Sequence, residues 1–145
     1  MESVAQQLRS LQQSFDAFDE AAAARLGVNR TDLRCLDLLL GKGPLSAGEL
    51  SAALKLSPAA TTTVIDRLER AGLVARTRDA ANRRRVLVTA TEAAGAAEAE
   101  VYLPLGAAGA EALSRYDEEQ LATILDFLRV AREVQEIQAA RLAAG

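Results

Sequence analysis

Two helix starts lie close together in the middle of the chain, at Ser46 and Ser57. Ser46 is followed three positions later by Glu49, which is the pattern of a capping box. Ser57 precedes Pro58, and proline is tolerated at the first position of a helix because its missing N–H has no partner there. A short helix joined by a turn to a second helix restricts this segment to a few compact helical arrangements.

Two stretches of alternating apolar and polar residues follow the second helix. LVARTR comes directly after Gly72, and RVLVTA comes after the polar segment DAANRR. Alternation with a period of two predicts β-strands, and the polar segment predicts a hairpin tip. The chain is therefore expected to be mainly α with a small β wing, as a winged helix-turn-helix over residues 31–90.

Three helices are expected to form the core of this region. Thr31 should cap the first, Gly41 and Gly43 should end it, and its buried residues should be Leu33, Leu36, Leu39 and Leu40. The second should bury Leu50, Ala53 and Leu54. The third, from Pro58 to Ala71, should bury Val64, Ile65 and Leu68, and Thr61 should be the most buried of its threonines.

Amphipathic helices are predicted on both sides, over residues 1–30 and 91–145. The first should end at Gly27, and its apolar stripe is Val4, Leu8, Leu11, Phe15 and Phe18. The last should begin near Asp117, with the stripe Leu121, Ile124, Leu125, Leu128 and Ala131. Between them, Pro104 should break or bend a helix near Leu103. The stripes need a surface to bury against, in a second copy or within the same chain.

Positive charge is concentrated in one short segment of an acidic chain. Residues 66–85 contain seven arginines and three acids, whereas the whole chain carries a net charge of −3. Phosphate contacts are short-range, so a local excess of arginine indicates nucleic acid even when the net charge is negative. The alternative is an ordinary solvated surface.

Composition argues against several other classes of protein. The chain contains no histidine and a single cysteine, Cys35, so the usual metal sites and the commonest general base are missing. No nucleotide-binding glycine motif and no apolar run long enough for a membrane span is present. We therefore expect no enzyme, metal, cofactor or membrane partner, and the lone cysteine fits a reducing cytoplasm.

The stretch from Leu68 to Val74 reads LERAGLV, and Arg76, then DAANRRR at 79–85, then Val86-Leu87-Val88 follow. It resembles the MarR family of winged helix-turn-helix regulators, over nearly the whole chain. The resemblance implies a single MarR-like domain over 1–145, in which residues 1–30 and 91–145 form a homodimer. It also implies binding of a pseudo-palindromic double-stranded operator and, most often, repression of transcription. Asn82 stands where the family has a second wing aspartate, which leaves a turn hydrogen bond but no ion pair.

The DNA-binding residues are expected on the helix from Pro58 and on the wing. The exposed face of the helix is predicted to be Ala59, Ala60, Thr62, Thr63 and Arg67, facing the major groove. Ser46 and Ser57 either contact phosphates or only cap their helices. By the resemblance, Arg84 enters the minor groove. Arg83 and Arg85 are expected to flank it on phosphates, with an Arg83–Asp79 pair as the alternative, and Arg76 completes the DNA-binding set.

The resemblance also implies a small aromatic or anionic effector that releases DNA. The residues expected to line its pocket are Phe15, Phe18, Leu36, Leu39 and Tyr102, although an ordinary core would use the same ones. Cys35 is expected to be a buried, inert thiol rather than an oxidant sensor. The alternative function is a winged-helix module whose wing arginines grip an acidic protein.

Overall fold

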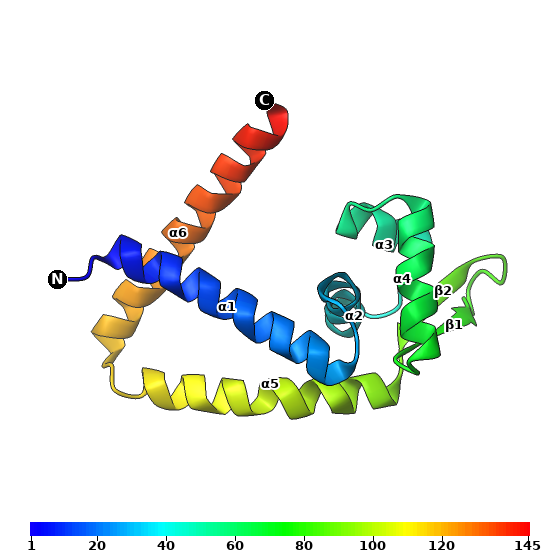
Figure 1. Ribbon diagram of the computed structural model, residues 1–145, viewed down its shortest axis with the longest axis horizontal. Coiled ribbons are helices and arrows are strands. Elements are labelled where there is room, and N and C mark those ends of the chain that lie inside the picture. The colour runs from blue at the N-terminus through cyan, green and yellow to red at the C-terminus, as the bar shows by residue number, and fades with distance from the viewer. The chain divides into compact units, whose positions relative to one another are not determined.

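The computed structural model describes residues 1–145 and contains six helices and one two-stranded sheet (Figure 1). The elements, in chain order, are α1 (Val4–Leu26), α2 (Arg30–Lys42), α3 (Ala47–Leu54), α4 (Pro58–Arg70), β1 (Val74–Arg78), β2 (Val86–Ala90), α5 (Glu92–Leu113) and α6 (Glu118–Ala144). The chain forms two compact units, Met1–Tyr102 and Leu103–Gly145. The first unit holds the predicted winged helix-turn-helix, which confirms the expected fold class.

Local side-chain caps set most of the helix boundaries. Reciprocal capping boxes begin α1, α2, α3 and α6, at Ser3, Asn29, Ser46 and Asp117. The predicted cap of α2 at Thr31 is wrong, because the Asn29 side chain accepts the Asp32 N–H at 2.8 Å and starts the helix earlier. Gly27 ends α1 as predicted, with φ 73°, a left-handed conformation that favours glycine.

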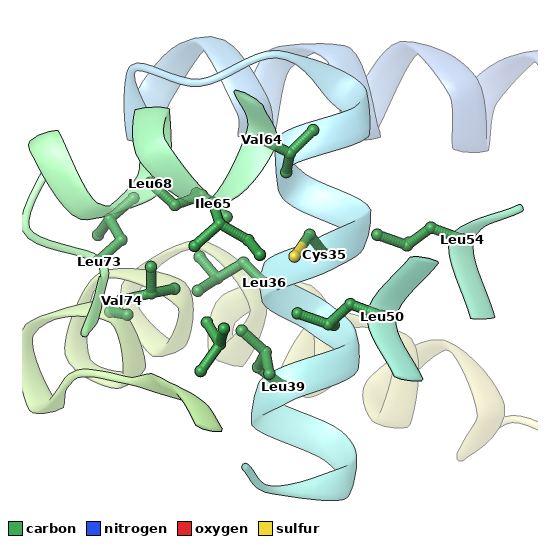
Figure 2. Close-up of a cluster of buried hydrophobic side chains, with 12 residues drawn as sticks. Cys35, Leu36, Leu39, Leu50, Leu54, Val64, Ile65, Leu68, Leu73 and Val74 are labelled. Carbon is green, nitrogen blue, oxygen red and sulfur yellow. The ribbon is translucent and has the colours of Figure 1, made fainter. Parts of the chain in front are cut away.

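Helix α2 lies at the centre of the apolar core of the first unit (Figure 2). Its buried residues Cys35, Leu36 and Leu39 pack with Leu50 and Leu54 of α3, Val64, Ile65 and Leu68 of α4, and Leu73, Val74, Val88 and Ala94. Two predicted core residues are corrections: Leu40 is 37% exposed and Ala53 is also exposed. Both lie at the edge of an apolar stripe, where helical periodicity does not decide which side the neighbouring helix covers.

The wing is an antiparallel pair in which Val74 lies opposite Ala90 and Arg78 lies opposite Val86. A third segment joins it, which the sequence did not reveal. Leu45 donates its N–H to the Val88 carbonyl at 3.1 Å and accepts the Val88 N–H at 2.7 Å. This bridge fixes the wing to the chain that enters α3, so the hairpin is a part of the core rather than an appendage.

Helix α5 is continuous from Glu92 to Leu113 with Pro104 inside it, so of the predicted break or bend near Leu103 the break does not occur. A proline inside a helix removes one hydrogen bond, but the following residues keep the helical pattern to Leu113. The boundary between the two compact units nevertheless falls at Leu103, directly before this proline.

Helix α6 buries none of its residues within the single chain. The predicted stripe is present, and its members are half-buried or exposed. A second apolar stripe, which the sequence reading missed, is formed at spacings of three and four by Phe127, Val130, Val134 and Ile137, each 40–56% exposed. No helix of the chain is both long and apolar enough to cross a membrane.

Candidate nucleic-acid interface

The outer face of α4 carries the predicted small residues. Ala59, Thr62 and Thr63 are exposed and Ala60 is half-buried, whereas Thr61 is 1% exposed, as predicted. The hydroxyls of Thr62 and Thr63 donate to the Pro58 and Ala59 carbonyls at 3.0 and 3.1 Å. A hydroxyl has one proton, so both threonines can still accept hydrogen bonds and present a methyl group, but cannot donate outward in this rotamer.

Ser57 and Ser46 cap their helices. The Ser57 hydroxyl accepts the Ala60 N–H at 3.1 Å, and the Ser46 hydroxyl accepts the Glu49 N–H at 3.1 Å. Ser57 is exposed and Ser46 is half-buried. Capping uses one lone pair and leaves the hydroxyl proton of each serine free for an acceptor such as a phosphate oxygen.

The tip of the wing is ordered by hydrogen bonds between residues close together in the chain. The side chain of Asp79 accepts the Ala81 N–H at 3.0 Å, and the Asn82 amide oxygen accepts the Arg84 N–H at 3.2 Å. The backbone then closes between Asp79 and Arg85, whose carbonyl accepts the Asp79 N–H at 2.9 Å. Asn82 therefore makes the turn bond expected of it.

Two predicted contact arginines are bound to carboxylates of α2 and α4. Arg67 grips Asp32 through both Nε and an Nη atom, at 2.9 to 3.2 Å, and Asp32 is 1% exposed. Arg76 donates to Asp66 and to Glu69, each at 2.7 Å. Charge-assisted bonds of this kind hold the guanidinium groups in fixed positions, and they raise the pKa of both arginines further.

Arg85 braces the wing against α3. Its guanidinium pairs with Glu49, the residue that also completes the α3 capping box, and lies 3.7 Å from Asp79. The alternative pairing of Asp79 with Arg83 is therefore wrong, because Arg85 occupies that carboxylate. Sequence reading missed these partners because Asp32 and Glu49 are distant in the chain, although Asp66 and Glu69 lay near enough to Arg76 to suggest a pair.

The other arginines of residues 66–85 have no carboxylate partner. Arg83 and Arg84 at the wing tip, and Arg70 at the end of α4, make no side-chain hydrogen bond or ion pair within the chain. Arg78 donates only to the Arg83 carbonyl, at 3.1 Å. Unpaired cations on an exposed hairpin are available to an anionic partner.

The residues predicted to line an effector pocket do not come together. Leu36 and Leu39 are 0% and 2% exposed and belong to the helix-turn-helix core, the ordinary core role that was the alternative to a pocket. Phe18 and Tyr102 belong to another cluster, with ring centroids 5.6 Å apart, and Phe15 is 60% exposed.

Acidic groups gather beside that second cluster. Burial raises the pKa of Glu98 to about 8, and hydrogen bonding to and repulsion by Asp37 add to it. Burial, together with the charge of Asp19, also raises the pKa of Asp37. Burial and then the charges of Asp37, Asp19 and Glu98 raise the pKa of Tyr102 to about 12. The Glu98 Oε2 atom is buried without a hydrogen-bond partner.

Cys35 is 0% exposed, as predicted. Burial, with a smaller effect of the Asp32 charge, raises the pKa of its thiol to about 11. A thiolate is the reactive form of cysteine, so this side chain acts as an apolar core residue.

These features define a winged helix-turn-helix transcriptional regulator. The MarR family model matches residues 28–86. The HTH-type transcriptional regulator YcgE of Bacillus subtilis (strain 168) is 38% identical over 125 residues, which cover 86% of this chain and 81% of YcgE. The chain belongs to the MarR family.

Solved structures share the fold over nearly the whole chain. A MarR family protein of Bacillus stearothermophilus is 26% identical with a TM-score of 0.67, and the match covers 92% of this chain and 95% of that one. A mutant of S. aureus MepR, solved bound to an oligodeoxyribonucleotide, has the same TM-score at 15% identity, with 93% and 99% covered.

Proposed function

We propose that this regulator is a homodimeric, sequence-specific DNA-binding repressor that acts in the cytoplasm on a pseudo-palindromic operator. The α4 face of each protomer enters a major groove, and the wing follows the backbone into the adjacent minor groove. Two-fold symmetry then places the half-sites about one helical turn apart.

The unpaired guanidinium groups of Arg83 and Arg84 carry this proposal. They stand on a hairpin that the Leu45–Val88 bridge and the Arg85–Glu49 pair fasten to the helix-turn-helix. A cation held on a braced element loses less conformational freedom on binding than one on a loose loop. Arg84 is the residue we assign to the minor groove, and Arg83 contacts a phosphate.

The paired arginines take a different role in this proposal. Arg67, Arg76 and Arg85 keep their intramolecular partners and orient α4 and the wing, and their positive charge adds to the field over the DNA-facing surface. Ala59, Ala60, Thr62 and Thr63 meet the base edges, where the threonines accept from base amino groups or touch thymine methyls. Ser46 and Ser57 donate to flanking phosphates.

The exposed apolar surface supports the dimer. Two apolar stripes on α6 are exposed to solvent, and on α1 the side chains of Val4, Leu11 and Phe15 are 43–66% exposed. A long helix without buried residues is marginal in water, because packing of an apolar face supplies most helical stability in proteins. A second copy covers these stripes in the proposed assembly.

We propose further that a neutral aromatic effector contacts the first unit beside α1 and α5 and releases the DNA. Phe15 is open there, and Phe18 and Tyr102 offer ring faces. The carboxylates of Asp19 and Asp37 create a negative field around Tyr102, which would repel an anionic effector. Titration of the protein–DNA complex with neutral and anionic aromatic compounds of equal size tests this polarity.

DNA recognition can be tested before any operator has been identified. Repeated selection from random duplexes should yield an inverted repeat, and the selected duplex should compete at least about 10³-fold better than a scrambled one. Enrichment of no sequence, with equal competition by both duplexes, would contradict the proposal and favour a winged-helix module that grips an acidic protein.

A further inference from the structure

A surface hollow of ≈ 460 Å³ lies between α3 and the start of α4. One wall is formed by the small residues of α3, and the other by the turn and the first residues of α4; the lining is Ala47, Gly48, Ser51, Ala52, Lys55, Leu56, Pro58 and Thr62. We call it the Lys55 hollow. It reaches the proposed DNA-binding face, because Thr62 belongs to both.

Lys55 occupies an unfavourable backbone conformation at the edge of this hollow. Its φ of 55° makes it the single non-glycine residue of the chain in the left-handed region, which glycine or asparagine normally fills at the end of a helix. Within the chain, the exposed ammonium group of Lys55 makes no hydrogen bond or ion pair, and only the dipole of α3 favours a cation at this end of the helix. A residue held in strain without an internal partner points to a role outside the chain.

Gly48, on the opposite wall, is a second residue that is locally unfavourable, because glycine is a poor helix former. Glycine inside a helix lowers its stability relative to alanine, yet a Cβ atom here would meet only the Ser46 hydroxyl, at 3.9 Å. The chain itself therefore has room for a side chain at this position. The open space in front of Gly48 allows the backbone of α3 to be approached closely from outside.

We propose that the Lys55 hollow seats a phosphate of the DNA backbone, held by the Lys55 ammonium group and admitted by the bare backbone at Gly48. Charge complementarity favours this occupant, because no carboxylate lines the hollow and its one charged residue is a cation. The proposal rests on the proposed DNA binding and adds to it a contact that fixes the register of α4 in the groove. Two residues that are unfavourable for the fold alone are both explained by it.

Substitution of each residue by the locally preferred one tests the proposal. Lys55→Gly and Gly48→Ala should leave the melting temperature unchanged or raise it, because each removes a local conflict. Both should weaken binding of the selected duplex roughly 3- to 10-fold at about 0.1 M salt, and Lys55→Gly should lower the salt slope by about one unit. The loss should be equal for selected and scrambled duplexes, because a phosphate carries no sequence information.

Two controls accompany these variants. Lys55→Arg keeps the charge and should keep binding within about 3-fold. Lys42→Ala removes the other lysine of the chain, at the exposed end of α2, and should leave binding unchanged.

The outcomes separate this inference from the proposed function. Wild-type affinity in both Lys55→Gly and Gly48→Ala would overturn the hollow as a phosphate seat and leave the regulator proposal intact. A loss restricted to the selected duplex would overturn the phosphate assignment in favour of a base contact. Failure of the wild-type chain to select any duplex would instead contradict the proposed function.

Discussion

The guanidinium group of Arg67, near the end of α4, holds the buried carboxylate of Asp32, in the first turn of α2, through three hydrogen bonds of 2.9 to 3.2 Å. Asp32 also accepts the Asn29 N–H at 3.2 Å as part of the α2 capping box. One carboxylate thus joins the start of α2 to α4. The pair fixes the orientation of α4 on the core of the first unit.

Loss of this pair should destabilise the fold. Arg67→Gln should lower the free energy of unfolding by about 1–3 kcal/mol, because it leaves a buried carboxylate without its cation. Arg70→Gln on the same helix removes an arginine that has no partner, and it should change the free energy of unfolding by less than about 0.5 kcal/mol. Urea unfolding at one fixed protein concentration compares the two, and equal stabilities would show that the pair contributes nothing.

Arg84→Ala should weaken DNA binding without affecting the fold. A minor-groove contact is worth about 1–3 kcal/mol, so the affinity for the selected duplex should fall roughly 5- to 150-fold. Fluorescence anisotropy measures the affinity, and circular dichroism checks that the melting temperature is unchanged. Arg9→Ala, on α1, removes the same charge far along the chain from the wing. If both variants bind alike, the assignment of Arg84 to the groove is wrong.

Ile137→Glu should shift the protein from dimer toward monomer. Ile137 is 56% exposed and lies on the second apolar stripe of α6, where a charge buried in an interface is costly. Ala140→Glu adds the same charge on the face of α6 that carries Arg129 and Glu133, and should leave the dimer intact. Sedimentation velocity over a range of concentrations distinguishes the two. A monomeric wild-type chain, or a dimer insensitive to Ile137→Glu, would contradict the proposed assembly.

Stability should decrease between mildly acidic and alkaline pH because of Glu98. The folded chain keeps a proton on this carboxyl up to about pH 8, whereas the unfolded chain loses it near its ordinary pKa of 4.5. The stabilising contribution is therefore complete below pH 4.5 and is lost as the pH rises through 8. Since solvent partly screens this half-buried group, the loss should be about 1–2 kcal/mol, less than the full shift implies.

Glu98→Gln should flatten that pH profile. The variant should melt a few degrees above the wild type at about pH 9 and together with it at about pH 4, because glutamine imitates the protonated acid. Glu111→Gln, an exposed glutamate of the same helix, should keep the wild-type profile. A wild-type melting temperature that rises between about pH 5 and 8 would show that the sign is wrong.

Cys35 should be inert toward thiol reagents in the folded protein. Its burial and a pKa of about 11 leave almost no accessible thiolate at neutral pH. Ellman's reagent should report no reaction with the native chain and one thiol after unfolding in guanidinium chloride, and hydrogen peroxide should leave DNA affinity unchanged. Rapid native reaction, or release of DNA by peroxide, would restore the oxidant-sensing hypothesis.

The first unit and its wing were predictable because they depend on neighbours along the chain. Ser46 and Glu49, or Ser57 and Pro58, lie within one helical turn of each other, and the alternation around residues 74–90 needs only adjacent residues. The continuity of α5 through Pro104 could not be predicted in this way, because a proline shows where a hydrogen bond is missing but not whether the helix ends there. The capping position of α2 was misjudged by two residues, where two polar side chains compete.

The sequence by itself determined the positions of the helices and strands, the concentration of arginine and the family to which they belong. Only the tertiary structure decided which arginines are free. Arg67 and Arg85 meet carboxylates 35 and 36 positions away, whereas Arg83 and Arg84 meet none. It also left Leu40 and Ala53 exposed and brought Leu45 to Val88. The physical reason is range: caps and periodic patterns act over a few residues, whereas ion pairs and packing act through space.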